Sequence, residues 1–407
     1  MMDNFDIKYS DIVAAQSRLK GITKQTSLLH SKSFSRMGDC NVFMKLENLQ
    51  TTGSFKVRGA YNKISHLSPE ELSRPVVAAS AGNHAQGVAY SSRELGAKST
   101  IFMPTFTPPL KVMATRSYGA EVVLAGEDFD EAFAISQEYC EKHNATYIHP
   151  FNDPLIIAGQ GTVGLEIFQQ LPEIDIIVVP IGGGGLISGI AIALKTLKPE
   201  IKVIGVEAEG AASMLASRNE DEILTIPHAH TIADGIAVKK PGDVTFGLVK
   251  EYVDDLITVS DSEMANTIYL LLQRAKILAE PSGVASVASV LYKKYDFKGK
   301  NVVPVISGGN INMSLLQQIV EKGMMEEGLR TTIQVLIPDQ PGELNKLTSV
   351  LEKFKISIQT IEHIRSITSV PIGNVLVVFT VDLQNRQQLN QVIEELASRG
   401  LHVEVLK

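Results

Sequence analysis

The chain has few of the features that mark secreted, metal-caged or membrane-spanning proteins. It contains two cysteines, Cys40 and Cys140, far apart and without CxxC spacing, which argues against a disulfide framework or a thiolate metal site. No apolar run approaches the ~20 residues that span a bilayer. The acidic residues Asp3, Asp6 and Asp11 interrupt the region where a secretory signal would be apolar. We therefore expect a cytoplasmic protein with no membrane partner.

The chain also lacks a long basic run, and its net charge is -7. Such a surface would repel a phosphate backbone, so nucleic acid is not expected as a partner and small molecules are favoured. Apolar residues make up 44% and charged residues 20%, as in ordinary folded proteins. A length of 407 residues predicts two or three packed units.

Between about residues 75 and 310, short β-branched runs alternate with amphipathic segments of helical length, which is typical of α/β proteins. The apolar runs do not alternate with polar residues, which predicts parallel strands covered on both faces. The expected strands are 75–79, 99–103, 121–124, 175–179, 202–206 and 301–306. The expected helices are 83–95, 108–118, 126–143, 186–197 and 261–279.

The last part of the chain has a different pattern. Strands are expected at 331–337, 356–364, 374–381 and 401–406, with helices at 341–354 and 386–399. This βαββαβ order predicts a ferredoxin-like unit. The charged stretch 321–330 reads as a linker between a catalytic domain, 1–320, and this C-terminal domain, 331–407. A small subdomain at about 45–150 is expected within the first domain.

One lysine stands in an unusual setting. Lys56 lies between Phe55 and Val57, with small or flexible neighbours in the stretch 51–60. A partly desolvated lysine has the lowered pKa that Schiff-base chemistry requires. On this pattern alone, however, a solvated surface lysine remains the better interpretation.

Three loops of small residues follow expected strands. The first is 80–84, with Ser80, Ala81, Gly82, Asn83 and His84, where exposed amides at a helix start could bind a carboxylate. An ordinary capped turn explains it equally well. The third, Ser307 to Asn310, would be a turn if taken by itself.

The second loop holds the consecutive glycines Gly182, Gly183, Gly184 and Gly185, followed by Leu186. Four glycines cost backbone entropy, and close approach of amides to a phosphate is the usual reason to tolerate that cost. The run fits neither GxGxxG nor a Walker motif, although Glu207 imitates the ribose-binding acid of a dinucleotide fold and keeps a nicotinamide cofactor as a minor alternative. Together with the lysine, the three loops predict one ligand cleft.

In order along the chain, 54–58, 80–84, 182–186, 280–283 and 307–310 resemble the motifs of fold-type II pyridoxal-phosphate enzymes, most closely the threonine ammonia-lyases. The resemblance runs from about residue 10 to 320. It implies that the cofactor is pyridoxal 5'-phosphate and that Lys56 binds it covalently. It also implies that Phe55 packs near the ring, Asn83 binds the ring hydroxyl, 182–186 hold the phosphate and Ser307 faces the ring nitrogen.

By this resemblance, the substrate is a small amino acid held by the loop Ser80, Ala81, Gly82 and His84. Threonine would lose its Cα proton to Lys56 and then its hydroxyl, and yield 2-oxobutanoate and ammonia, with serine as a further substrate. A neutral Ser307 makes the cofactor a weaker electron sink, which suits prompt loss of a β-substituent. Racemases of the fold carry a hydroxyl where Ala81 stands, so racemisation should be poor. Their metal site is matched only by Glu207, with Ser213 in place of an aspartate, and no metal is expected.

The C-terminal unit resembles an ACT domain, which implies an amino-acid effector such as isoleucine or valine bound at the loop with Asp339, Pro341, Gly342 and Leu344. The alternative is a domain that serves only dimerisation. A homodimer or homotetramer is expected. A serine or hydroxyaspartate dehydratase and a non-catalytic amino-acid sensor stay open as alternatives, because pocket shape decides between similar substrates. The histidines His66, His143, His149, His228 and His230 show no metal-binding spacing and are expected to be structural or exposed.

Overall fold

The computed structural model describes residues 7–366 and 368–406. The chain forms two compact units, Met1–Asn312 and Met313–Lys407. The division falls at residue 312, not at the expected 320, because helix α14 (Met313–Glu326) belongs to the second unit and packs on its strand β11. Residues 321–326 of the expected linker are the last turns of this helix.

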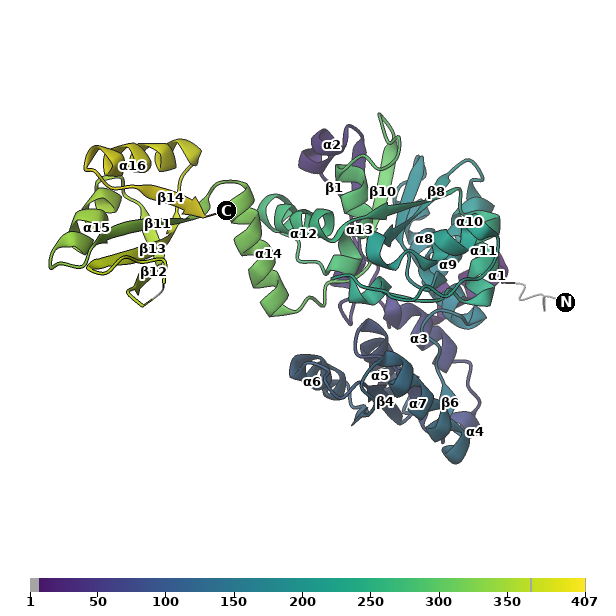
Figure 1. Cartoon of the computed structure of the whole chain (residues 1–407). Coiled ribbons are helices and arrows are strands. Elements are labelled where there is room, and N and C mark those ends of the chain that lie inside the picture. The colour runs from purple at the N-terminus through teal and green to yellow at the C-terminus, as the bar shows by residue number, and fades with distance from the viewer. Residues whose placement is uncertain (1–6, 367, 407) are drawn as a thin grey trace. The chain divides into compact units, whose positions relative to one another are not determined.

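The first unit contains a six-stranded sheet in the order β1-β2-β10-β7-β8-β9. All neighbours pair in parallel except β1, which is antiparallel to β2. Helices α9 (Gly185–Leu197) and α13 (Pro281–Leu291) pack on the central strands, which explains why these strands are apolar without alternation (Figure 1). The strands are β1 (Leu28–His30), β2 (Asn41–Leu46), β7 (Ile176–Pro180), β8 (Lys202–Ala208), β9 (Asp255–Val259) and β10 (Asn301–Ile306).

A second, four-stranded parallel sheet in the order β5-β4-β3-β6 lies between β2 and α8 in the chain. Figure 1 shows helices α5, α6 and α7 gathered around it. Its core is made by small and branched residues such as Ala78, Val88 and Ile101. The elements are β3 (Val76–Ala79), β4 (Ser99–Met103), β5 (Glu121–Leu124), β6 (Thr146–Tyr147), α5 (Asn83–Glu94), α6 (Pro109–Ser117) and α7 (Phe129–His143).

The remaining helices include α8 (Pro154–Gln170), which has no polar face to reveal it because it is buried along most of its length. The expected helix 261–279 is wrong in its second half: α12 (Asp261–Leu270) runs into a π-turn at Leu271–Ala275, and Lys276 adopts φ 61°. A lysine in the left-handed region ends the helix. The others are α1 (Tyr9–Arg18), α2 (Lys32–Gly38), α3 (Lys56–Ile64), α4 (Pro69–Leu72), α10 (Ser213–Glu220) and α11 (Asp243–Tyr252). The 3₁₀ turns are η1 (Glu47–Leu49), η2 (Glu209–Ala211) and η3 (Asp234–Ile236).

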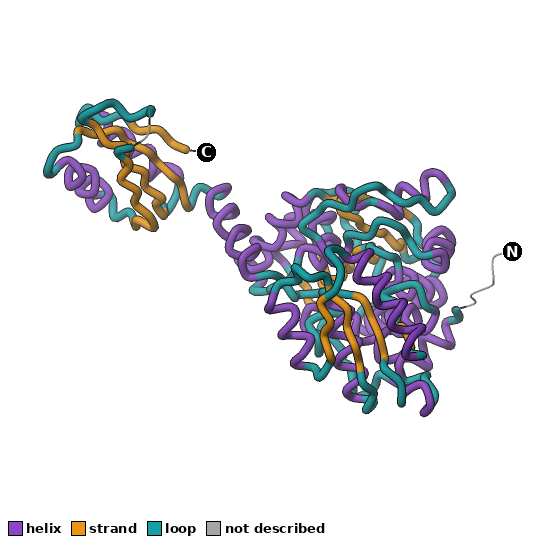
Figure 2. The backbone as a smooth tube through the Cα atoms, turned by 60° about the horizontal axis from the view of Figure 1, so that its bottom comes forward, coloured by secondary structure: helices purple, strands orange, loops and turns teal. Residues whose placement is uncertain are grey.

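The second unit has the predicted βαββαβ order and an antiparallel sheet, β12-β13-β11-β14. Alternate residues of β11 and β13, such as Ile333 and Val377, pack against α15 and α16 in one core. Figure 2 shows these strands in orange, with the helices of the same unit in purple. The elements are β11 (Arg330–Pro338), α15 (Glu343–Lys353), β12 (Ser357–Ile364), β13 (Asn374–Asp382), α16 (Arg386–Ser398) and β14 (Val403–Leu406). Within the described ranges, the helices are too short or too polar to cross a bilayer.

Candidate active site

Lys56 is the first residue of α3, and the residue as a whole is half-buried. Nζ donates a hydrogen bond of 2.9 Å to the carbonyl of Pro150 and lies 5.3 Å from the ring centroid of Phe55. Burial lowers the pKa of Lys56 to about 8, and the negative charge of Glu280 opposes this only in part. The amine is therefore available in its neutral, nucleophilic form close to physiological pH. A solvated surface lysine, the better interpretation on the pattern alone, is wrong.

Asn83 is held between two other polar side chains. Its Nδ2 donates to Glu280 Oε1 at 2.6 Å, and its Oδ1 accepts from Asn310 Nδ2 at 2.6 Å. Asn310 also donates to the carbonyl of Thr52 at 3.0 Å, three residues before Phe55. Burial, followed by the charge of Asp234, raises the pKa of Glu280 to about 7. The asparagine loop, the 280–283 motif and the 307–310 loop therefore meet at one hydrogen-bonded cluster.

The glycine loop connects β7 to α9. Gly184 has φ +92° and is the N-cap residue of α9, where no side chain caps the helix. A Cβ atom at Gly183 would lie 2.2 Å from the ring of Phe151, and one at Gly185 would lie 2.9 Å from the Phe151 carbonyl oxygen. Glycine is therefore required here partly because Phe151 packs directly against the loop. The first-turn amides of α9, including those of Gly185 and Leu186, have no intrahelical acceptor and can bind a phosphate.

Ser307 follows β10 and its side chain is 4% exposed. Its carbonyl accepts from the amide of Phe55 at 3.2 Å, which places it beside the lysine segment. The hydroxyls of the nearby Ser54 and Ser282 are buried without a hydrogen-bond partner inside the described ranges. Uncapped helix amides, a buried amine and unsatisfied hydroxyls are the groups that a phosphorylated aldehyde would satisfy. The residues present therefore fit pyridoxal 5'-phosphate.

The loop expected to bind the substrate carboxylate contributes mainly backbone. Ser80 Oγ accepts from the amide of Gly82 at 3.2 Å. The His84 side chain is buried, and its Nε2 bonds the carbonyl of Ile148 at 2.8 Å. Burial, with the charge of Lys56, lowers the pKa of His84 to about 3, so its ring is neutral. What this loop offers a carboxylate is the uncapped start of α5, after Gly82.

Glu207, which the sequence analysis compared with a ribose-binding acid and with a metal ligand, lies at the end of β8. It is fully buried and accepts hydrogen bonds from the amides of Met214, at 2.9 Å, and Leu215, at 2.7 Å, at the start of α10. Burial raises its pKa to about 7. Glu207 therefore accepts from the free amides at the start of α10. Across the described residues, no group of three His, Cys, Asp or Glu side chains could hold a metal ion.

The loop expected to bind an effector lies at a hollow of ≈ 320 Å³ in the second unit. Gly342, with φ +95°, is the N-cap residue of α15 and no side chain caps the helix. Asp339 accepts two hydrogen bonds from Arg365, at 2.7 and 2.9 Å. The hollow is lined by the expected residues together with five more that were not expected to bind the effector: Ile337, Pro338, Gln340, His363 and Arg365.

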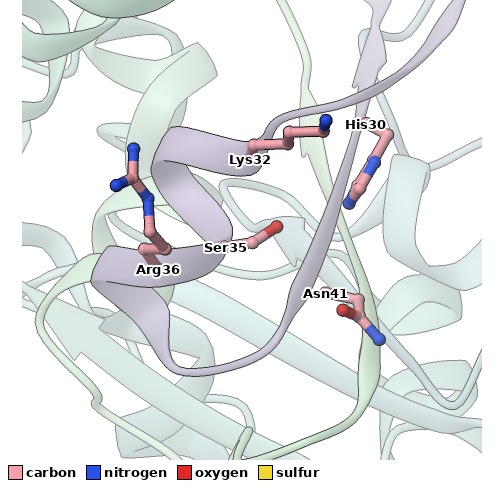
Figure 3. A pocket seen from close by; sticks show the side chains of 5 residues that line it. All are labelled: His30, Lys32, Ser35, Arg36 and Asn41. Atoms are coloured by element: carbon pink, nitrogen blue, oxygen red, sulfur yellow. The ribbon is translucent and has the colours of Figure 1, made fainter.

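A second surface hollow, of ≈ 370 Å³, lies on β1, α2 and β2 of the first unit. His30, Lys32, Ser35, Arg36 and Asn41 line it. Figure 3 shows Arg36 pointing away from Lys32 and His30, so the basic side chains do not converge on one point. The hollow therefore has no geometry that would hold a single anion.

Sequence reasoning missed three parts of the site. Asn310 was named only as the end of a turn, and Glu280 was left without a role. The carbonyl of Pro150 gives no side-chain signal at all. The one usable signal was Glu280, an acidic residue within a motif of small residues. Acidic residues are rarely buried without a partner, and the structure shows that Glu280 is buried.

Comparison with known proteins agrees with this geometry. The family model described as pyridoxal-phosphate dependent enzyme matches residues 19–308, and the ACT domain model matches 331–400. An L-threonine ammonia-lyase of Thermotoga maritima is 45% identical over 400 residues, which is 98% of this chain and 100% of the relative. The catabolic L-threonine dehydratase of Escherichia coli K12 is 45% identical over 315 residues, 77% of this chain and 96% of the relative.

Two solved structures have the same fold as the first unit. The processed threonine deaminase isoform 2 of Solanum lycopersicum has a TM-score of 0.73 at 39% identity, covering 77% of this chain and 92% of its own. Maize serine racemase has a TM-score of 0.74 at 35% identity, covering 79% of this chain and 99% of its own. The chain therefore belongs to the pyridoxal-phosphate-dependent enzymes and carries an ACT domain at its C-terminal end.

Proposed function

We propose that the chain is an L-threonine ammonia-lyase, which converts L-threonine to 2-oxobutanoate and ammonia and also acts on L-serine. The observation that carries this proposal is the buried Lys56 amine, whose pKa is lowered to about 8, in the unit that contains the uncapped glycine loop. The relative from Thermotoga maritima, 45% identical over 98% of the chain, supports the same reaction.

When bound, pyridoxal phosphate supplies the electron-withdrawing group that makes the Cα proton of an amino acid acidic. The chain's own residues bind the groups and move the proton. The Lys56 amine would hold the cofactor aldehyde, and in its free form it is the base that would take the Cα proton. The first-turn amides of α9 hold the phosphate, and the amides at the start of α5 orient the substrate carboxylate. The hydrogen bonds of Asn83 to Glu280 and Asn310 hold its amide in place for the ring hydroxyl.

A neutral Ser307 facing the ring nitrogen would not keep that nitrogen protonated, which favours elimination over transamination. Ala81 offers no hydroxyl to return a proton to the opposite face of Cα, which argues against racemisation although maize serine racemase shares the fold. Dehydration of serine or hydroxyaspartate is the second candidate. A non-catalytic amino-acid sensor is disfavoured, because the chain has Lys56, the uncapped starts of α5 and α9, and the hydrogen-bonded cluster around Asn83.

Release of the keto acid from threonine, serine and hydroxyaspartate tests the proposal. We expect the highest kcat/KM for threonine, because one methyl group in a fitted pocket is worth ~1–3 kcal/mol. A higher value for hydroxyaspartate or serine would contradict the substrate assignment. Protein that shows no visible absorbance after incubation with pyridoxal phosphate would contradict the enzyme class.

We also propose that an amino acid such as isoleucine or valine binds at the second unit and regulates the first. The uncapped start of α15 can accept a carboxylate, and the hollow beside it is partly apolar. The relative from Escherichia coli is matched over 96% of its own length by 315 residues, about the length of the first unit, and its name is that of a threonine dehydratase. Truncation after Asn312 should therefore keep turnover and abolish any effector response. A response that survived truncation would place the sensor elsewhere.

The assembly is proposed to be a homodimer or homotetramer, because ACT units commonly bind effectors between paired copies. The cytoplasmic location stays a prediction from sequence. Sedimentation with and without isoleucine would show the size of the assembly and whether the effector changes it.

A further inference from the structure

Residues 148–153 cross from the small sheet to α8, and they contact each part of the candidate active site. The carbonyl of Ile148 accepts from His84 at 2.8 Å, and that of Pro150 accepts from Lys56 at 2.9 Å. The Phe151 ring lies where a Cβ of Gly183 would be. Asn152 accepts from the amide of Val244 at 3.2 Å, and Asp153 caps α8. The asparagine loop, the lysine and the glycine loop thus share one short segment.

His149 holds this segment in a turn. Its Nδ1 accepts hydrogen bonds from the amides of Phe151, at 3.2 Å, and Asn152, at 2.8 Å. Its ring also packs edge to face on Phe151, with centroids 4.7 Å apart. Two amides on Nδ1 require an unprotonated Nδ1, and therefore the neutral ring with its proton on Nε2.

The surroundings keep the ring neutral. Burial, followed by the charge of Lys56, lowers the pKa of His149 to about 4, and Asp153 and Asp243 oppose this only in part. The histidine that sequence spacing dismissed as structural or exposed is therefore committed to orienting two peptide groups, those on the C-terminal sides of Pro150 and Phe151.

We propose that His149 is a positioning residue, which fixes the Pro150 carbonyl against the Lys56 amine and the Phe151 ring beneath the glycine loop. Because the Pro150 carbonyl and the Phe151 amide belong to the same peptide group, holding the amide on Nδ1 also fixes the direction of the carbonyl. The carbonyl gives the free amine a fixed place whenever the lysine is not bound to the cofactor. A displacement of about 1 Å in such a site can cost ~10²-fold in rate.

This inference rests on the proposed role of Lys56, so its test uses a readout that does not require turnover. The charged or titratable groups that act on Lys56 are Glu280, His84 and His149 itself. An ammonium that donates to a carbonyl is stabilised, so turning that carbonyl away should lower the pKa of Lys56 further. The pKa can be measured in cofactor-free protein from the pH dependence of Lys56 acetylation, followed by mass spectrometry, with the exposed Lys98 as internal reference.

The variants H149N and H149Q form a matched pair. Both lose the imidazole ring and both are neutral amides, but only asparagine places an acceptor oxygen at the position of Nδ1. We expect H149N to keep the acetylation midpoint of Lys56 and to keep kcat within about threefold of the parent. H149Q should lower the midpoint by at least ~0.5 pH units and reduce kcat by ~10- to 100-fold.

Equal midpoints in H149N and H149Q would overturn the inference, whatever their activities. If the two variants lost kcat equally but had unequal midpoints, the turn at His149 would control the pKa of Lys56 without affecting turnover. That result would overturn the positioning role of His149. Should cofactor be trapped by borohydride on another lysine, the proposed function fails while the acetylation result still reports on the turn.

If a His149 variant does not fold, Phe151→Leu replaces it in the test. This change keeps the turn and removes the ring beneath the glycine loop. It should leave the Lys56 midpoint unchanged and weaken binding of pyridoxal phosphate by ~10-fold, because the glycine loop loses the ring that packs against it and its amides are held less well in place. A shifted midpoint would overturn the assignment.

Discussion

Two cations on the same helix, Lys56 and Arg58, are buried in opposite ways. Lys56 Nζ has a carbonyl as its hydrogen-bond acceptor and, within the described ranges, no carboxylate in ion-pairing distance. Arg58 is 1% exposed and binds Glu47 through two hydrogen bonds of 2.8 Å and Glu166 through bonds of 2.6 and 3.0 Å. Lys56 therefore has no carboxylate partner in this part of the chain, whereas Arg58 is paired with two carboxylates.

The pKa values follow this difference. Burial would lower the pKa of Arg58, but Glu47 and Glu166 together raise it. Burial lowers the pKa of Lys56 to about 8 because Glu280 alone opposes it. Lys45, which is 2.6 Å from Glu166, completes a cluster of two cations and two anions next to Arg58. In the cluster, each buried charge is compensated by charges of opposite sign, and removing one partner would leave the others uncompensated. Lys56 lacks such compensation, and perturbed pKa values of this kind occur mainly at functional sites.

The largest expected effect is on catalysis, in Lys56→Ala. We expect turnover of threonine to fall by ~10³-fold or more, because the same amine binds the cofactor and moves the proton. Keto-acid release measures this. Lys98→Ala, at an exposed lysine, should be silent. Full turnover in Lys56→Ala would show that the unpaired cation has no catalytic role.

The next effect is on stability, in Arg58→Met. The change leaves Glu47 and Glu166 buried with only Lys45 nearby, and should lower the free energy of unfolding by ~3–5 kcal/mol. Denaturation in urea measures it. Lys202→Met breaks a pair in which the lysine is 55% exposed, and should cost far less than Arg58→Met because solvent screens the pair. If the two variants lost equal stability, the contrast between buried and exposed pairing would not hold in this protein.

Glu280→Gln tests the same comparison at the carboxyl group whose charge acts on Lys56. The pKa of Glu280 is raised to about 7, so its neutral form stabilises the fold below pH ~4.5 and this stabilisation is lost as pH rises through 7. Glutamine imitates the neutral form. In cofactor-free protein, stability should therefore fall between pH 5 and 8 by on the order of 3 kcal/mol more in the parent than in the variant. Parallel pH profiles would mean that Glu280 is already ionised at pH 5.

The smallest effect concerns exposed pairs between the small sheet and residues 234–239. Lys111 pairs with Asp234 and Lys239 with Asp130, at 2.5 and 2.7 Å. Since these side chains are partly exposed, Lys239→Met should change stability only slightly, and less in high salt. A loss as large as that of Arg58→Met would show that this pair is shielded from solvent in the assembled protein.

The fold could be predicted from sequence wherever periodicity was clear. The six strands at 75–306 and all six elements of the second unit lie where they were expected, with ends shifted by one or two residues in most cases. Helix α8 was missed because a helix buried on all sides has no polar face, and the π-turn after Leu270 was missed because its residues still look helical.

The sequence alone determined the enzyme family, the two units and the chemical groups that pyridoxal phosphate requires, because these depend on local motifs and their order. Only the tertiary structure decided the hydrogen-bond partners, the ion pairs and the burial of those groups. It paired Arg58 and left Lys56 unpaired, turned His84 inward, used Glu207 as a helix cap and brought Pro150 and His149 to the lysine. The pKa of a buried group depends on charges and carbonyls contributed by distant segments, and no local pattern records which segments will meet.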